Sequence, residues 1–448
     1  MLAHVTQTRG TIEKPSPAGA EPPLVIEHRE ALIYMICAAA ELEHALMCEY
    51  LFAAFSLKES KDEGLTGEQL AAVNRWRTTI FGVASQEMLH LALTANMLTA
   101  LGASPHLSRP NLPQPARHYP AAVKLAFLPF GEQALRHFLY LERPEGMALG
   151  DAEGMGALGE AAPLMTTEDI VPHLQEFSTV GHLYRSIEEG FRHLTDKLGA
   201  EHLFVGPPQA QITGAAFRWP ELLPVVDLAS AKSAIEEIVE QGEGSHGNWR
   251  QAHFGRFKAV LDEFLAMKAA DPGFEPARPV VAARVRRGEG DTTGPLITDP
   301  LTAKVADLSN VIYEVLLLLL YRLLARIDET DEEATTLADV AVGLMFQGVG
   351  RVGKVLSTLP VGPEMPGATA GAPFELFYQP DYLLPHREAA WLLISERLAE
   401  AGAFAERLSG SVPALGPVAT ALGRHAETIS ARAKRTPLKV GATPAKPT

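Results

Sequence analysis

The sequence predicts an all-α protein, namely a four-helix bundle with one long connection followed by a second helical domain. Apolar residues recur with helical spacing through the long segments 29–58 and 67–101. A short loop joins these two segments, whereas a much longer crossover, 102–166, opens with a run of prolines. Two more helical segments follow the crossover, which gives the order typical of a bundle with one long crossover connection.

The composition is that of a soluble globular protein, with 47% hydrophobic and 21% charged residues. The net charge of −15 argues against nucleic acid as a partner, because the nucleic-acid backbone is itself a polyanion. The two cysteines, Cys37 and Cys48, fit a reducing compartment. No secretory segment is visible at the N-terminus, and the most apolar run, 311–325, is short for a membrane span and carries charges. We therefore expect a cytoplasmic protein that acts without a membrane partner.

The first domain is expected over residues 28–270, after a flexible tail at 1–27 that is rich in proline and glycine. Within it the fourth helix meets the run EQGEGSHGN and then resumes as HFGRF, so we expect a helix that is opened rather than ended. The predicted segments, in chain order, are helices at 29–58 and 67–101, a short amphipathic helix near 131–142, a third helix at 167–198, an extended or hairpin-like stretch at 200–226, and a fourth helix from about residue 229.

The second half of the chain is expected to begin with a linker at 271–300, which is charged and rich in proline. A C-terminal helical domain over 301–434 follows, and a basic tail at 435–448 is expected to be disordered. The helices predicted in this domain cover 301–327, 332–359, 386–409 and 414–433.

The segment Trp76–Leu101 carries the most informative motif, Glu87-x-x-His90. At 100° per residue, Glu87 and His90 fall in the middle of an apolar face that includes Ile80 and Leu98. A buried carboxylate and a buried imidazole need a partner, because an isolated buried charge is very costly. A divalent metal ion is the simplest partner, and the same spacing is used on two helices of dinuclear carboxylate bundles.

The first helix offers three glutamates as a further ligand, Glu41, Glu43 and Glu49. Glu43 shares its face with Ile36 and Tyr50, whereas Glu41 and Glu49 lie more than about 100° away around the helix. Glu43 is therefore the candidate from this helix.

The third helix offers Glu188, which shares a face with aromatic residues. The fourth helix is ambiguous: we favour Glu243 with His253, and we keep Glu240 and His246 as alternatives. His253 could equally be a structural histidine near the end of the bundle.

Together these residues predict a centre of four carboxylates and two imidazoles, which suits two divalent ions. Oxygen ligands combined with imidazole favour Fe, with Mn as the alternative. Tyr50 and Tyr184 are the candidate catalytic side chains on the same inward faces, although each could instead be a core aromatic. The predicted metal ligands are Glu43, Glu87, His90, Glu188, Glu243 and His253.

Several longer segments resemble the ferritin-like iminophenylpyruvate dimer synthase family over roughly residues 29–430. Its namesakes are much larger enzymes that couple two oxidised aromatic amino acids in violacein and rebeccamycin biosynthesis. The resemblance implies a ferritin-like metal-binding bundle and a distal half of the same family. It rests on the segments AAELEHALMCEYLFAAFSLK, SQEMLHLALTANML, HLYRSIEEGF, IVEQGEG followed by HFGRF, and LMFQGVGRVGKVLSTLPVGPEMPGATAGAPFEL.

The expected function is that of a non-haem, dinuclear-metal oxidoreductase of secondary metabolism. Its expected substrate is a small aromatic molecule derived from an amino acid. The alternatives are a ferritin-like protein that binds metal without organic turnover, and a structural partner in a biosynthetic complex. The sequence leaves room for a homodimer.

Overall fold

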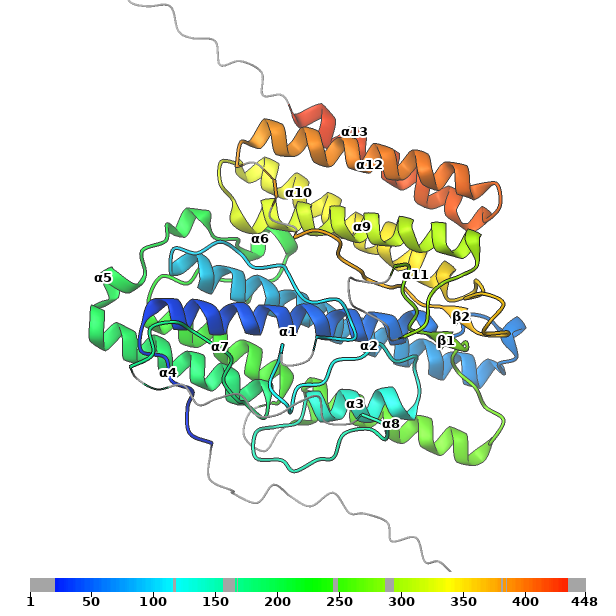
Figure 1. Ribbon diagram of the computed structural model, residues 1–448, viewed down its shortest axis with the longest axis horizontal. Helices are drawn as coiled ribbons and strands as arrows, with labels where there is room; N and C mark the ends of the chain where they lie inside the picture. The colour runs from blue at the N-terminus through cyan, green and yellow to red at the C-terminus, as the bar shows by residue number, and fades with distance from the viewer. Residues whose placement is uncertain are drawn as a thin grey trace, which may run out of the picture.

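The computed structural model describes residues 21–115, 118–155, 166, 168–244, 249–286, 294–379, 382–383 and 385–433. These residues form helical layers stacked on one another (Figure 1). The middle layer is the pair α1 (Arg29–Ser56) and α2 (Gly67–Ala100), which pack along their length. On one side of this pair lies the layer that completes the predicted bundle, and on the other side lie the C-terminal helices in two tiers. The all-α fold is therefore confirmed.

The layer below α1 and α2 contains two columns, and each column is interrupted near its middle (Figure 1). Helix α4 packs against α7 under one end of α1, and α3 packs against α8 under the other end. The interruption of the fourth helix by its glycine-rich run is thus confirmed. The four helices are α3 (Glu132–Leu141), α4 (Val180–Leu198), α7 (Leu228–Gly242) and α8 (His253–Ala270).

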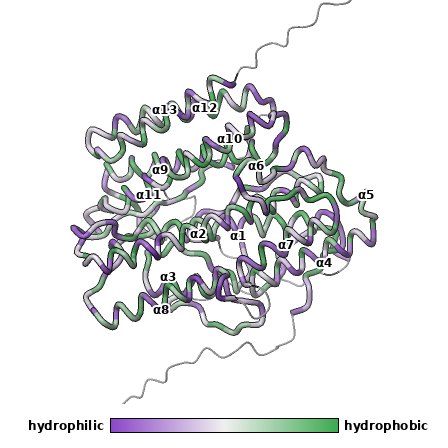
Figure 2. The backbone as a smooth tube through the Cα atoms, turned by 180° about the vertical axis from the view of Figure 1, so that it is seen from behind, coloured by the Kyte–Doolittle hydropathy of each residue, from purple (hydrophilic) through white to green (hydrophobic). Residues whose placement is uncertain are grey.

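Helix α1 is apolar nearly all round because it contacts both outer layers (Figure 2). On the side of the C-terminal domain, backbone packs directly onto its aromatic rings. A Cβ added at Gly353 would lie 2.3 Å from the Phe55 ring, and one added at Gly371 would lie 2.0 Å from the Phe52 ring. Only glycine permits so close an approach at these two positions.

Two predictions for the first half of the chain are wrong, one about where a helix begins and one about the conformation of a segment. The third helix begins at Val180 rather than at 167, because the Thr179 hydroxyl caps it by accepting a hydrogen bond from the backbone N–H of His182. The stretch 200–226, predicted to be extended, instead contains two short helices, α5 (Ala200–Leu203) and α6 (Gly214–Phe217). Side-chain amides satisfy its backbone in place of a partner strand: Asn96 donates to the carbonyl of Ile212 at 2.9 Å.

The C-terminal helices, expected to form a second domain, pack on one another and on the α1–α2 pair. The single helix predicted over 332–359 is divided by a π-helical turn at Met345–Val349. This turn lies where Gly348 and Gly350 weaken the helix. The helices are α9 (Pro300–Ala325), α10 (Asp331–Leu344), α11 (Gly350–Leu356), α12 (Arg387–Ser409) and α13 (Gly416–Ala433).

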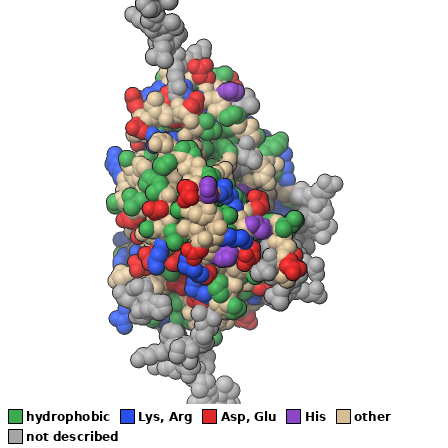
Figure 3. All heavy atoms as spheres, turned by 90° about the vertical axis from the view of Figure 1, so that its left-hand side faces the viewer, with side chains coloured by type: hydrophobic (Ala, Val, Ile, Leu, Met, Phe, Trp, Pro, Cys, Tyr) green, Lys and Arg blue, Asp and Glu red, His purple; other side chains and the backbone are tan. Residues whose placement is uncertain are grey.

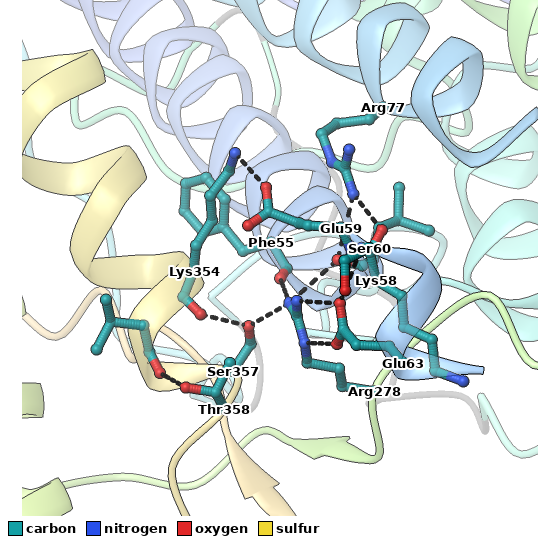
Figure 4. A network of polar contacts seen from close by, with 12 residues as sticks. Phe55, Lys58, Glu59, Ser60, Glu63, Arg77, Arg278, Lys354, Ser357 and Thr358 are labelled. Carbon is teal, nitrogen blue, oxygen red and sulfur yellow. Dashed lines mark hydrogen bonds and ion pairs between the residues drawn. The ribbon is translucent and has the colours of Figure 1, made fainter. Parts of the chain in front are cut away.

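The first part of the expected linker is packed against both halves of the chain. Strand β1 (Val280–Val281) pairs in parallel with β2 (Thr369–Ala370). The Arg278 guanidinium donates to both carboxylate oxygens of Glu63, at 2.6 and 2.9 Å, and to the Ser357 hydroxyl at 2.9 Å (Figure 4). Arg278 therefore connects the loop after α1 to the end of α11.

Among the described residues, α1 and α9 are each long and apolar enough to cross a membrane. Most of the apolar window of each helix is buried inside the protein, 67% for α1 and 78% for α9. Both therefore serve as core helices here.

On the face at the α5 end of the molecule, acidic and basic side chains are interspersed (Figure 3).

Candidate metal centre

Helices α1 and α2 bring three buried ligand-type side chains together. The Nδ1 atom of His90 lies 3.2 Å from Glu43 Oε2 and 3.3 Å from Glu87 Oε2. Exposure of the three side chains does not exceed 2%. Their candidate ligand atoms all lie within 4.8 Å of one another, so this first position could hold a metal ion.

A second group shares Glu87 with the first. Glu87 Oε1 lies 2.9 Å from His253 Nδ1, which lies 3.5 Å from Glu142 Oε1. Glu87, Glu142 and His253 again place their candidate ligand atoms within 4.8 Å of one another. Because one oxygen of Glu87 faces each group, its carboxylate is placed to bridge two ions.

The donor set fits a pair of divalent cations. Two ligand atoms on one ion, each about 2.1 Å from it, lie roughly 3.0–3.4 Å apart, which is close to the observed separations. Among the described residues, His253 Nε2 is buried without a hydrogen-bond partner, and His253 Nδ1 and Glu87 Oε1 face each other at 2.9 Å without the geometry of a hydrogen bond. Buried polar atoms are normally satisfied, so this cluster of acceptors and imidazoles needs protons or cations.

Three helix ends supply or surround the second group. Glu142 is the C-cap of α3, and His253 is the first residue of α8. A Cβ on Gly242, at the end of α7, would lie 3.6 Å from Glu142 Oε2. The interruptions in the two lower columns therefore coincide with the centre.

Glu43 and Glu142, the carboxylates that belong to one group each, both accept a hydrogen bond from a tyrosine. The Tyr184 hydroxyl donates to Glu43 Oε1 at 2.6 Å, and the Tyr50 hydroxyl donates to Glu142 Oε1. Burial and the neighbouring carboxylates raise the pKa of both phenols well above the ordinary value, so both remain protonated donors.

The cluster retains protons when no cation is bound. Burial and the adjacent Glu87 carboxylate raise the pKa of Glu43 to about 8. Burial alone would lower the pKa of His253, but Glu87 and Glu142 raise it to about 9. Burial alone would likewise lower the pKa of His90, yet the carboxylates of Glu43 and Glu87 raise it well above the ordinary value. A metal ion that binds here must displace these protons.

Two residues predicted as ligands lie outside both groups. Glu188 sits on the flank of α4 with its side chain 34% exposed, and its carboxylate lies 3.5 Å from Lys232 Nζ. The buried stripe of α4 is formed instead by Tyr184 and its neighbours one and two turns away. Glu243 is half-buried, and its carboxylate accepts hydrogen bonds from the backbone N–H groups of Gly181 at 2.8 Å and Glu145 at 3.0 Å.

The alternatives for the fourth helix do not join the groups either. Glu240 is exposed on α7, and His246 lies outside the described residues. The structure therefore brings together Glu43, Glu87, His90 and His253 from the predicted set, with Tyr50 and Tyr184 beside them.

Sequence reasoning missed Glu142. It lies in the crossover, where a bundle ligand is not expected, at the end of the short helix α3. A signal was present, because Leu135 and Phe138 precede it by seven and four residues and share its helical face. The second group thus contains a carboxylate from the crossover in place of one from the third long helix.

A family model described as Ferritin-like matches residues 36–262, which is about half of the chain. The chain belongs to the Ferritin-like family. All five side chains of the two candidate groups lie within the matched region of this ferritin-like chain.

Two relatives match the ferritin-like chain over 83% of its length at 26% identity. They are dichlorochromopyrrolate synthase of Lentzea aerocolonigenes and 2-imino-3-(indol-3-yl)propanoate dimerase of Chromobacterium violaceum. The chain spans only 38% and 36% of the lengths of these relatives. These matches confirm the resemblance seen in the sequence.

A solved ferritin-like protein from Caulobacter vibrioides is also similar. It is 20% identical, with a TM-score of 0.40, and the match covers 65% of this chain and 85% of that one.

Proposed function

We propose that this protein is a dinuclear non-haem metal oxidoreductase. The observation that carries the proposal is the pair of buried ligand groups that share Glu87. Three carboxylates and two imidazoles form a larger polar cluster than packing requires, and apolar side chains would fill the same space at lower cost.

The proposed ions are two Fe, with Mn as the alternative, because oxygen and imidazole ligands suit both metals. When bound, such a pair supplies two-electron chemistry with O₂. Glu87 would contribute one oxygen to each position, and Glu43 with His90 and Glu142 with His253 would complete the two positions. The Tyr184 and Tyr50 hydroxyls can each hold a proton at the outer carboxylate they contact.

The proposed substrate is a small aromatic molecule derived from an amino acid, and the proposed setting is cytoplasmic secondary metabolism. The support for this substrate class is the pair of relatives, one named as an indolyl-imino-propanoate dimerase and the other as a chromopyrrolate-type synthase. Whether this chain couples two such molecules into a dimer is a question for the assay below.

A ferritin-like protein that binds metal without organic turnover is the second candidate. The observation that favours it is the burial of all five candidate ligand side chains, none of which is more than 6% exposed. A cavity of about 10 Å³, lined in part by Leu42, Leu141 and Val180 but by none of the candidate ligands, has room for a single water molecule only. An organic substrate would need the helix ends around Glu142 to move apart.

The test combines metal analysis with O₂ uptake. The apoprotein would be loaded anaerobically with Fe(II) and then mixed with O₂, with and without indole-3-pyruvate plus ammonium as the source of an aromatic imino acid. We expect two Fe(II) per chain, O₂ uptake above that of free iron, and faster uptake with the organic substrate. Uptake that the substrate does not change would favour the metal-binding candidate, and an absence of bound redox metal would overturn the oxidoreductase.

A further inference from the structure

We propose that Gln241 and Glu237 fix His90 as an Nδ1 ligand, and that they thereby make the Glu43–Glu87–His90 position the tighter of the two metal positions. This inference rests on the proposed dinuclear centre and concerns residues that belong to neither ligand group. Gln241 lies in the last turn of α7, and Glu237 lies one turn before it.

A chain of hydrogen bonds sets the orientation of the Gln241 amide. Its Nε2 group donates to Glu237 Oε1, and its Oε1 atom lies 3.2 Å from His90 Nε2. Because the amide nitrogen faces the Glu237 carboxylate, the amide oxygen must face His90. An amide oxygen only accepts hydrogen bonds, so His90 Nε2 must carry the proton and donate it.

The consequence appears at the other ring nitrogen. With its proton on Nε2, a neutral His90 directs the Nδ1 lone pair at the space between Glu43 Oε2 and Glu87 Oε2. A hydrogen bond from the distal N–H to an acceptor orients a ligating imidazole and makes it more basic. Removal of such a partner typically weakens metal binding by about 10- to 100-fold.

His253 is held differently. It is the first residue of α8, and within the described ranges its Nε2 atom has no hydrogen-bond partner. Its Nδ1 atom faces Glu87 Oε1 and Glu142 Oε1. The two positions therefore have similar ligands, but only His90 has a hydrogen-bond acceptor for its Nε2 proton among the described residues. This difference predicts two metal-binding steps of unequal affinity.

The test is to titrate the apoprotein with Co(II) alone and to monitor binding by the d–d absorption of the bound ion. The wild-type protein should show a tight step and a weaker step. Gln241→Leu, which keeps the volume but removes the acceptor, should weaken the tight step by about 10- to 100-fold and leave the weaker step within about threefold. Gln241→Glu retains an acceptor oxygen and should keep the tight step.

A spectroscopic readout reports the tautomer directly. In Zn(II)-loaded protein with ¹⁵N-labelled histidine, His90 should show a protonated Nε2 and a metal-bound Nδ1, and Gln241→Leu should disturb this pattern. Glu236→Gln, at an exposed position of α7 that pairs with Lys232, is the matched control and should change neither readout.

The outcomes separate the two proposals. If wild-type protein binds no Co(II) at the centre, the proposed function fails. If it binds two ions but both Gln241 variants match the wild type, or if Gln241→Leu weakens both steps equally, the role assigned to Gln241 and Glu237 is wrong. Circular dichroism confirms that each variant is folded before titration.

Discussion

At the scale of single residues, the centre depends on one carboxylate more than on any other. Glu87 directs Oε2 at His90 and Oε1 at His253, so both candidate positions lose a ligand if it is removed. Glu43 and Glu142 each belong to one position only. The five candidate ligands therefore consist of one shared carboxylate and two separate pairs.

We expect Glu87→Ala to abolish binding at both positions, whereas Glu43→Ala and Glu142→Ala each weaken one. The measurement is the metal content per chain after Fe(II) loading and desalting. Glu188→Ala is the control, because its carboxylate lies beside Lys232 and outside both groups. A loss of metal in Glu188→Ala equal to that in Glu87→Ala would contradict the assignment.

Helical register predicted the shared inward position of Glu43, Glu87 and His90, because α1 and α2 are long and regular. Register failed for Glu188, since the buried face of α4 is narrower than the apolar pattern implied. It failed for Glu243 because the carboxylate is held by backbone amides contributed by two other segments, which no local pattern reveals. Glu142 was missed because its place depends on how the crossover folds back beneath α1.

A second buried polar cluster allows a test of pH dependence. His137 Nδ1 lies 2.9 Å from Asp151 Oδ1, and His137 Nε2 lies 3.5 Å from Glu49 Oε2. Burial alone would lower the pKa of His137, but these two carboxylates raise it to about 9. Burial also raises the pKa of Glu49, which reduces the net stabilisation that the charged His137–Glu49 pair provides.

The folded-state pKa of His137 lies above the ordinary unfolded value, so its contribution to stability is complete below about pH 6.5 and is lost as the pH rises through about 9. The corresponding free energy is at most of the order of 3 kcal/mol. We expect His137→Gln to destabilise the protein more at pH 6 than at pH 9.5. Urea unfolding at both pH values measures the difference, and an equal loss at both would contradict the charge assigned to His137.

At the scale of elements, the two interrupted columns place helix ends, rather than helix sides, around part of the centre. Glycine makes one of these junctions possible. The backbone N–H of Gly181, near the start of α4, donates to Glu243 Oε1, and a Cβ at Gly181 would lie 2.0 Å from that oxygen. No larger residue fits while the Glu243 carboxylate keeps this position.

We expect Gly181→Ala to displace the Glu243 carboxylate and to destabilise the protein by about 1–3 kcal/mol, the usual cost of overpacking. Gly82→Ala is the matched control, because a Cβ there meets nothing within 4 Å and the position is an exposed site inside α2. That control should stabilise the protein by about 0.5–1 kcal/mol. The free energies of unfolding in urea provide the comparison, and destabilisation by both variants would contradict the close contact.

The sequence was informative about elements where local chemistry marks their ends. The short helix in the crossover and the glycine break in the fourth helix were predicted, because amphipathic spacing and glycine act locally. The stretch 200–226 was predicted wrongly, since its conformation depends on Asn96 and Gln211 side chains that bond to its backbone.

At the scale of the whole molecule, the C-terminal domain and the bundle share α1. The two glycine contacts on Phe52 and Phe55, and the Arg278 network after α1, tie the halves together (Figure 4). We therefore expect the bundle and the C-terminal domain to unfold together.

Gly371→Ala tests this coupling, because its Cβ would meet the Phe52 ring. We expect it to lower the midpoint of a single calorimetric transition, with a loss of about 1–3 kcal/mol. Gly423→Ala, where a Cβ meets nothing within 4 Å, is the control inside α13. Two separate transitions, with only one of them shifted, would show that the halves unfold independently.

The double role of α1 also sets an order of events during synthesis. Glu43 emerges early, yet its metal position needs α2, and the second position needs His253 at the start of α8. The other apolar face of α1 waits longer still, because α9 begins only at Pro300. Since translation adds about 5–20 residues per second, an apolar helix stays uncovered on a growing chain for about ten seconds or more, a state that favours association with chaperones.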